Sequence, residues 1–397
     1  MIEIFKAAIG RGASDIHIKS GDMVRARVHG RLVPLTRERV SHDQVKALAL
    51  KFIPHERDRL RIDELTDYDC SWGASGLGRF RVNILKQRGS FMIVLRVIPF
   101  EVPTFEELRL PDILARIAEN ERGLILVTGV TGSGKSSTMA AMVEHINNTF
   151  ERHIVTLENP IEFLHRDKRC SITQRDIGTD TQSFQAGLRA ALRQDPDVIL
   201  IGEMRDTETI DTALKAAETG HLVISTLHTQ NAVQTLSRII AVFPPSDQEM
   251  VRVRLAETLQ AVVSQRLLPM KHEDGRIVAC EVMNVTGTIR DCILDPERMV
   301  EIPDLLEEGR ETYGSQSFDQ HLIELLREDK VTFQVAKAAA TNPNDLDLKV
   351  NFYGEGKAGD GDAGDAGGGR AGARGSKRGS DVVTAGLDPS LLRGKGS

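Results

Sequence analysis

The stretch that decides the fold is GVTGSGKS, residues 129–136, which fits the pattern G-x-x-x-x-G-K-[ST]. It lies between an apolar run, LILVT at residues 124–128, and a helix-like run, SSTMAAMVEHIN at residues 136–147. A strand, a glycine-rich loop and a helix N-terminus in this order bind phosphate, because backbone N–H groups of the loop point at the phosphate oxygens. A chance glycine turn is the alternative, and the flanking patterns favour the nucleotide site.

Each residue type in this loop has a task at such a site. Glycines let the backbone approach the phosphates, Lys135 reaches the β- and γ-phosphates, and the hydroxyl of Ser136 is expected to bind Mg²⁺. ATP and Mg²⁺ are therefore the expected cofactors. The residues expected to bind them are Gly129, Thr131, Gly132, Ser133, Gly134, Lys135, Ser136 and Ser137.

Around this loop, short apolar runs alternate with helical patterns. The runs are LILVTG, HIVTLE, DVILIG and HLVIST, which begin at residues 124, 153, 197 and 221. Strands buried on both faces and joined by helices predict a mostly parallel sheet in an α/β core over residues 111–342. We expect residues 248 to about 340 to be helical, interrupted by one strand at RIVACEVMNV, residues 276–285.

Three further strand ends carry chemically active side chains. Glu203 follows DVILIG and is placed to orient or deprotonate the attacking water, although the acid that usually precedes it is here Gly202. Glu158 ends HIVTLE, and His228 follows HLVIST. Each glutamate alone could instead be a solvated strand end or a helix cap, and a lone histidine at a sheet edge is more commonly a structural residue. Together with Lys135 they favour one catalytic site, because parallel strands present their carboxyl ends at one edge.

Residues 1–100 have a different sequence pattern, which predicts a small α+β unit. A strand is expected at residues 15–20, a hairpin at 23–35 turns at Gly30, and Ser41 caps a helix. A second hairpin at residues 78–99 turns near Gly89, and residues 101–110 read as a linker.

Composition excludes several classes of protein. The 397 residues carry 51 Lys and Arg against 57 Asp and Glu, a net charge of −6, which gives no basic footprint for nucleic acid. No signal peptide and no apolar run of membrane-spanning length is present. The four cysteines are far apart and form no CxxC pair, so neither a zinc site nor a disulfide framework is expected. A cytoplasmic protein is expected.

The last part of the chain is rich in glycine. Of the 34 glycines, 14 fall in the last 44 residues, a composition that cannot bury enough apolar area to order itself. We therefore expect a disordered Gly-rich tail over residues 343–397. The alternative is a tether, in which VVTAGLDPSLL at residues 382–392 docks on a partner.

These motifs together resemble the secretion ATPase superfamily, which drives type II and type IV secretion and type IV pili. GVTGSGKS, TLENPIEF, DPDVILIGEMRD and TGHLVISTLHT stand in that family's order, and the resemblance covers residues 1–340. It is closest to the twitching or pilus retraction branch. Extension and type II secretion ATPases have an extra amino-terminal domain and usually a four-cysteine zinc insertion, and neither is found in this sequence.

The resemblance implies a homohexamer in which a PAS-like amino-terminal domain packs on a RecA-like core. It also implies that Arg81 and Arg96 contact the nucleotide phosphates and take part in catalysis. The implied partner is an inner-membrane pilus platform protein, through which the cytoplasmic motor associates peripherally with the inner membrane. The implied function is ATP-driven type IV pilus retraction and twitching motility.

Two departures from the family pattern keep alternatives open. Asn159 stands where the family commonly has Asp, and TIRDCILD at residues 288–295 replaces an AIRNLIRE-like segment, keeping Ile289 and Arg290 but losing a later Arg-Glu pair. A weakly hydrolysing accessory subunit is one alternative, and a pilus-extension or secretion ATPase is another. A nucleic-acid translocase is a third, disfavoured by the net charge and the few aromatic residues.

Overall fold

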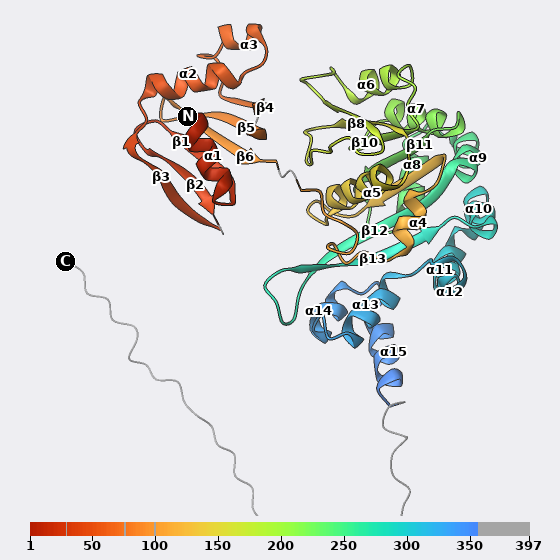
Figure 1. Ribbon diagram of the computed structural model, residues 1–397. Coiled ribbons are helices and arrows are strands. Elements are labelled where there is room, and N and C mark those ends of the chain that lie inside the picture. The colour runs from red at the N-terminus through yellow and green to blue at the C-terminus, as the bar shows by residue number, and fades with distance from the viewer. Residues whose placement is uncertain (29, 75–76, 99–100, 356–397) are drawn as a thin grey trace, which may run out of the picture. The chain divides into compact units, whose positions relative to one another are not determined.

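The computed structural model describes residues 1–28, 30–74, 77–98 and 101–355, and these form two β-sheets with their own helices (Figure 1). The expected fold class, a mixed α/β chain with an antiparallel α+β part followed by a parallel-dominated core, is confirmed. Among these residues, no helix combines the length and the apolarity needed to cross a bilayer.

The amino-terminal sheet is antiparallel and has six strands in the order β3-β2-β1-β6-β5-β4. Buried and more exposed side chains alternate along its strands, so only one face of the sheet is buried. In β5, for example, Phe80, Val82 and Ile84 are buried while their neighbours are not. The strands are β1 (Ala13–Lys19), β2 (Met23–Val28), β3 (Arg31–Arg39), β4 (Asp67–Ala74), β5 (Gly78–Gln87) and β6 (Ser90–Val97).

Three helices accompany this sheet, α1 (Ile2–Gly10), α2 (His42–Phe52) and α3 (Glu56–Leu60). Ser41 begins α2 as expected, in a capping box in which its hydroxyl accepts from the Gln44 N–H. Phe5 of α1 and Phe52 of α2 pack with Trp72 and Phe80 of the sheet, which gives this region its own aromatic core. The amino-terminal sheet and its helices therefore share one apolar cluster of their own.

The second sheet has seven strands in the order β13-β12-β7-β11-β10-β8-β9. All pairs are parallel except the antiparallel β12–β13 pair. The strands are β7 (Gly123–Thr128), β8 (His153–Glu158), β9 (Ser171–Asp176), β10 (Val198–Ile201), β11 (Leu222–Leu227), β12 (Leu259–Pro269) and β13 (Arg276–Asn284). The phosphate-loop strand β7 therefore lies near the middle of the sheet.

Helices cover both faces of this sheet, which is why β7, β10 and β11 are buried along their whole length. One face packs against α4 (Ile113–Ala118) and α5 (Lys135–Thr149). The other packs against α6 (Phe184–Ala191), α7 (Thr207–Glu218), α8 (Ala232–Ala241) and α9 (Gln248–Thr258). The expected RecA-like arrangement of a parallel sheet between helices is present.

One part of the core differs from the expectation. Residues 259–269 were expected to continue a helical region, but they form strand β12, which pairs with β7 on one side and β13 on the other. Helix α9 ends at Thr258 and β12 begins at the next residue, Leu259, so no glycine or proline marks the change from helix to strand. Because the strand is buried on both faces, its run LQAVVSQRLLP lacks the polar alternation that would distinguish it from a helix.

The remaining helices follow β13, and they extend further than expected. They are α10 (Gly287–Leu294), α11 (Ile302–Glu308), α12 (Arg310–Tyr313), α13 (Phe318–Arg327), α14 (Phe333–Ala339) and α15 (Pro343–Glu355), with a 3₁₀ turn at Pro296–Glu301. Residues 343–355 are thus helical, which corrects the expected start of the tail, since Leu346 is fully buried. The rest of the expected tail, residues 356–397, lies outside the described residues.

The expected linker belongs in part to the core. Phe105 and Leu108 pack against the cluster beneath α4 and α5, and Leu110 is buried within it. Apolar contact of this kind ties residues 105–110 to the ATPase core rather than leaving them as a free connection.

Candidate active site

The phosphate loop joins β7 to α5 and is shaped by its glycines. Gly129, Gly132 and Gly134 all have positive φ, a region that other residues rarely adopt. A Cβ on Gly129 would also lie 2.5 Å from the Gln265 carbonyl oxygen of β12, so the loop is packed tightly against that strand. The first turn of α5 points its unpaired N–H groups at the same loop, which is the geometry that binds phosphate.

Lys135 is the first residue of α5, and its side chain turns back over the loop. Its ammonium group donates to the carbonyl oxygens of Gly129 at 2.9 Å and Val130 at 3.1 Å. Burial lowers the pKa of Lys135, while the charge of Glu203 acts in the opposite direction. A cation held over a glycine loop in this way is placed to meet phosphate oxygens.

Glu203 lies two residues beyond β10, at the carboxyl-terminal edge of the sheet. Its carboxylate is 2.7 Å from the Arg205 guanidinium and 3.6 Å from His228 Nε2. Gly202 before it approaches the end of β8 closely, and a Cβ there would lie 3.3 Å from the Leu157 carbonyl oxygen. An acidic side chain at residue 202 would have little room, because β10 packs closely on β8 there.

Glu158 ends β8 and is held by three hydrogen bonds. Thr156 donates to one carboxylate oxygen at 2.7 Å and Gln174 to the same oxygen at 3.3 Å, while the Glu162 N–H donates to the other at 3.3 Å. Burial raises the pKa of Glu158, against these hydrogen bonds, which favour the ionised form. A fixed carboxyl group with a raised pKa suits proton transfer.

His228 follows β11 and is about half exposed, with its ring 3.6 Å from the Glu203 carboxylate. Because β7, β11, β10 and β8 are neighbours in that order, their ends meet at one edge of the sheet. Lys135, His228, Glu203 and Glu158 accordingly line one pocket, together with Ser136 and Ser137 of the phosphate loop. The structure thus brings the core residues predicted from the sequence to one place.

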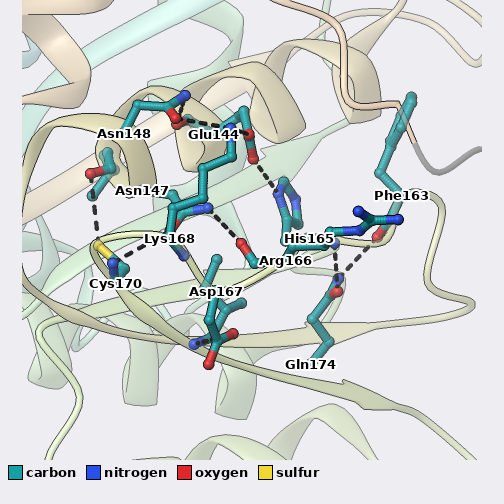
Figure 2. Close-up of polar contacts among 12 residues, drawn as sticks. Glu144, Asn147, Asn148, Phe163, His165, Arg166, Asp167, Lys168, Cys170 and Gln174 are labelled. Carbon is teal, nitrogen blue, oxygen red and sulfur yellow. Dashed lines mark hydrogen bonds and ion pairs between the residues drawn. The ribbon is translucent and has the colours of Figure 1, made fainter.

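The segment after Glu158 is hydrogen-bonded to the carboxyl-terminal half of α5 (Figure 2). The buried side chain of Asn147 donates to the Arg166 carbonyl oxygen and accepts from the Lys168 and Cys170 N–H groups. Glu144 on the same helix pairs with His165 at 3.3 Å and with Lys168. Its hydrogen bond with His165, together with the charges of Lys168 and His165, lowers the pKa of Glu144 to about 2.

Gln174 of β9 completes this attachment. Its amide group donates to the Phe163 carbonyl oxygen at 2.9 Å and accepts from the His165 N–H at 2.9 Å (Figure 2). The same amide also donates to Glu158 at 3.3 Å. Helix α5 and the end of β8 are therefore connected through one hydrogen-bonded segment.

Arg81 and Arg96 lie in the amino-terminal sheet, directly opposite each other on β5 and β6. Both arginines are exposed, but Arg96 also donates to Asp15 at 2.9 Å. Asp15 is almost fully buried, and its pKa is lowered below the usual range because hydrogen bonds from Arg96 and Ser14 outweigh the effect of burial. Arg96 therefore has an ion-pair partner within its own sheet, and Arg81 is the freer of the two to contact a phosphate.

The residues present fit a nucleotide with a divalent cation. The Ser133 hydroxyl, buried behind the loop, has no hydrogen-bond partner among the described residues, and Ser136 exposes its hydroxyl at the loop surface. No group of three or more His, Cys, Asp or Glu side chains in the described part of the chain could hold a metal ion unaided. A cation here would depend on Ser136 and on the phosphate oxygens themselves.

Comparison with known proteins agrees with this geometry. The family model described as type II/IV secretion system protein matches residues 1–274. The chain belongs to this family. As a type II/IV secretion system protein, it is 41% identical over 344 residues to the type IV pilus retractation ATPase PilT of Pseudomonas aeruginosa, across 87% of this chain and 99% of that protein.

Two further similarities extend this finding. The type IV pilus ATPase PilU of the same organism is 38% identical over 358 residues, across 90% of this chain and 92% of that protein. A crystal structure titled as the pilus retraction motor PilT with bound ADP is 42% identical and superimposes with a TM-score of 0.78, covering 88% of this chain and 99% of that one.

The expected family and the expected enzyme class, an ATPase, are confirmed for this type II/IV secretion system protein. The expected function, that of the pilus retraction type, agrees with the names of these relatives. The roles assigned to individual residues stay predictions.

Three residues at the site were not predicted. Arg205 pairs with Glu203, Gln174 contacts Glu158, and Glu144 anchors the connecting segment. The TQRD stretch that holds Gln174 carries no periodic or motif signal, and its contact with Glu158 arises because β9 pairs with β8. Only the position of Arg205 two residues after a predicted catalytic glutamate could have drawn attention to it.

Proposed function

We propose that the chain is an ATP-hydrolysing motor for type IV pilus retraction and twitching motility. The observation that carries this proposal is the meeting of Lys135, His228, Glu203 and Glu158 at the phosphate-loop edge of one sheet. Phosphoryl transfer requires mainly positioning and charge neutralisation, which a lysine, a carboxylate and an array of N–H groups supply.

Each side chain has a distinct part in hydrolysis. The glycine loop and the first turn of α5 bind the phosphates, and Lys135 moves from the loop carbonyl oxygens to the β- and γ-phosphate oxygens. Glu203 orients the attacking water and accepts its proton, while His228, 3.6 Å away, lies beside that carboxylate. Glu158 is a second carboxyl group in the same pocket.

The cation expected with ATP would be held by the Ser136 hydroxyl. Bound Mg²⁺ neutralises the phosphate charge that develops during transfer. Arg81 and Arg96, which the family resemblance assigns to the phosphates, would add guanidinium charge from the amino-terminal domain.

Replacing Glu203 by Ala tests the hydrolytic role. We expect turnover to fall by about 100-fold or more with ATP binding retained, because the water loses its base while the phosphate loop is untouched. Steady-state phosphate release and nucleotide titration measure the two effects, with Glu121→Gln, an exposed glutamate away from the pocket, as control. Turnover in Glu203→Ala equal to that of the wild type would refute the assignment.

Lys135→Ala should instead lose nucleotide affinity.

The assembly belongs to the same proposal. We infer a homohexamer in the cytoplasm that attaches peripherally to the inner membrane through a pilus platform protein. Its support is the similarity to PilT over nearly the whole of that protein. The particle mass of the purified chain with ATP analogue tests the hexamer, and co-purification with the platform protein tests the attachment.

An accessory ATPase is the second candidate, and a specific observation favours it. The segment TIRDCILD lies mainly in α10, where Ile289 is buried but Leu294 and Asp295 are exposed at the positions of the lost Arg-Glu pair. An exposed leucine stands there in place of a charged residue, and similarity to PilU is nearly as high as to PilT.

Deletion in the source organism separates these candidates. Loss of a retraction motor gives hyperpiliated, non-motile cells, whereas loss of an extension motor gives bald cells. An accessory subunit would leave piliation near normal, and the purified protein alone would release little phosphate.

A further inference from the structure

A row of polar side chains crosses three strands of the core sheet. Thr128 of β7 pairs in register with Ser264 of β12, which in turn pairs with Glu281 of β13. Thr128 and Ser264 are fully buried and Glu281 is 8% exposed, on the face that packs against α8 and α9. Polar groups in register at such depth are expensive to bury unless they bond to one another.

These side chains form a continuous chain of hydrogen bonds. The Thr128 hydroxyl donates to Ser264 Oγ at 3.0 Å, and the Ser264 hydroxyl donates to Glu281 Oε1 at 3.4 Å. The same oxygen accepts from the backbone N–H of Ala232 at 2.7 Å. Glu281 Oε1 is therefore the common acceptor for a strand and for the first residue of α8.

The two ends of this chain adjoin the proposed catalytic groups. Thr128 directly precedes Gly129, the first residue of the phosphate loop. Ala232 begins α8 four residues after His228, and Asn231 caps that helix by accepting from the Gln234 N–H. The Glu281 carboxylate supplies a second acceptor to the helix N-terminus, where orphan N–H groups and the helix dipole favour a negative charge.

We propose that Glu281 is a positioning residue for ATP hydrolysis, which holds the segment carrying His228 in register with the strand that enters the phosphate loop. It does not reach the pocket itself, and it acts through Ser264, Thr128 and the first turn of α8. This inference rests on the proposed roles of His228 and the phosphate loop.

The charge state of Glu281 gives the proposal a measurable signature. Burial raises the pKa of Glu281 to about 7, opposed by the hydrogen bond from Ala232 and by the charge of Arg266 on β12. Asp319 of α13 acts in the same direction as burial. Because a carboxylate accepts hydrogen bonds more strongly than a carboxylic acid, the connection to α8 weakens as the pH falls through 7.

The test compares Glu281→Gln, Glu281→Ala and wild-type protein by turnover, KM for ATP and nucleotide affinity between pH 6 and 8.5. We expect Glu281→Ala to lose about tenfold in kcat, with KM and nucleotide affinity within about twofold, because the phosphate loop stays formed. Glu281→Gln imitates the protonated group, so its kcat should stay near the wild-type value at pH 6 across the whole range.

One control variant and two contrary outcomes make the test decisive. Glu151→Gln, at an exposed position away from both ends of the row, should follow the wild-type pH profile. Superimposable pH profiles of kcat for wild-type and Glu281→Gln protein would overturn the proposal, as would parallel losses of kcat, nucleotide affinity and thermal midpoint in Glu281→Ala. If wild-type protein itself releases no phosphate, the proposed function fails instead, which is a separate result.

Discussion

At the scale of single residues, Gly202 shows how packing determines which side chains a catalytic strand can carry. The strand β10 ends with Gly202 against the last residues of β8, and a Cβ at that glycine would lie 3.3 Å from the Leu157 carbonyl oxygen and 3.5 Å from the Glu158 Cα. Glu203, one residue further on, carries the carboxylate instead. The position of Glu158 therefore depends on the absence of a side chain at residue 202.

Replacing Gly202 by Ala tests this dependence. We expect a loss of about 1–2 kcal/mol in the free energy of unfolding, since the backbone of β8 must move to admit a methyl group, and a fall in turnover as Glu158 shifts. Urea unfolding and phosphate release measure the two effects. Gly287→Ala is the matched control, because nothing lies within 4 Å of a Cβ there and alanine favours a helix. Equal unfolding midpoints for the two variants would contradict the packing argument.

At the scale of secondary-structure elements, the segment between β8 and β9 has its own electrostatic support. Glu144 of α5 lies between His165 and Lys168, and its side chain is only 13% exposed. The pKa of Glu144 is about 2 in the folded protein, against an ordinary value of 4.5. The ionised carboxylate therefore stabilises the fold at every pH above about 4.5.

This stabilisation is lost as the pH falls from about 5 towards 2, because the unfolded chain binds the proton first. At neutral pH it amounts to on the order of 3 kcal/mol. We expect wild-type protein to lose more unfolding free energy than Glu144→Gln over this range, as measured by urea unfolding at successive pH values. Glu151→Gln, at the exposed end of the same region, serves as control. Parallel pH curves for wild-type and Glu144→Gln protein would show that the ion pairs carry no net energy.

The elements differ in how far the sequence alone could predict them. Strands β7, β8, β10 and β11 were predicted because each is a short apolar run bounded by turns and followed by a motif. Strand β9, SITQRD, has little apolar character to recognise, and β12 follows a helix without a break. The lysine, the two glutamates and the histidine of the site were accessible from motifs. Gln174 and Glu281 were not, because their partners are brought to them by strand register.

At the scale of the whole molecule, catalysis is proposed to draw on both sheets. Arg81 and Arg96 stand opposite each other on the amino-terminal sheet, and their environments differ. Both side chains are exposed, but Arg96 also compensates the charge of the buried Asp15. The two arginines should therefore respond differently to replacement.

We expect Arg81→Ala to lower turnover at least tenfold without changing the thermal midpoint, since it removes charge from the phosphates and no buried contact. Arg96→Ala should lower both quantities, because the buried Asp15 loses its nearest cation and keeps the Ser14 hydroxyl and, at 4.0 Å, Arg27. Phosphate release and thermal unfolding measure this, with the exposed Arg39→Ala as control. Wild-type turnover in Arg81→Ala would remove that residue from the proposed machinery.

The strand order has a consequence for building tools from this protein. Because the reactive groups all stand at one edge of the core sheet, the opposite edge is free of them, and the turn at Thr219–Gly220 lies there, six strand residues or about 20 Å from His228. Gly220 has a φ of +104°, at which a side chain would be strained, whereas Thr219 before it is exposed. A fluorophore attached at position 219 would therefore follow the subunit during its working cycle at a distance from the reactive groups.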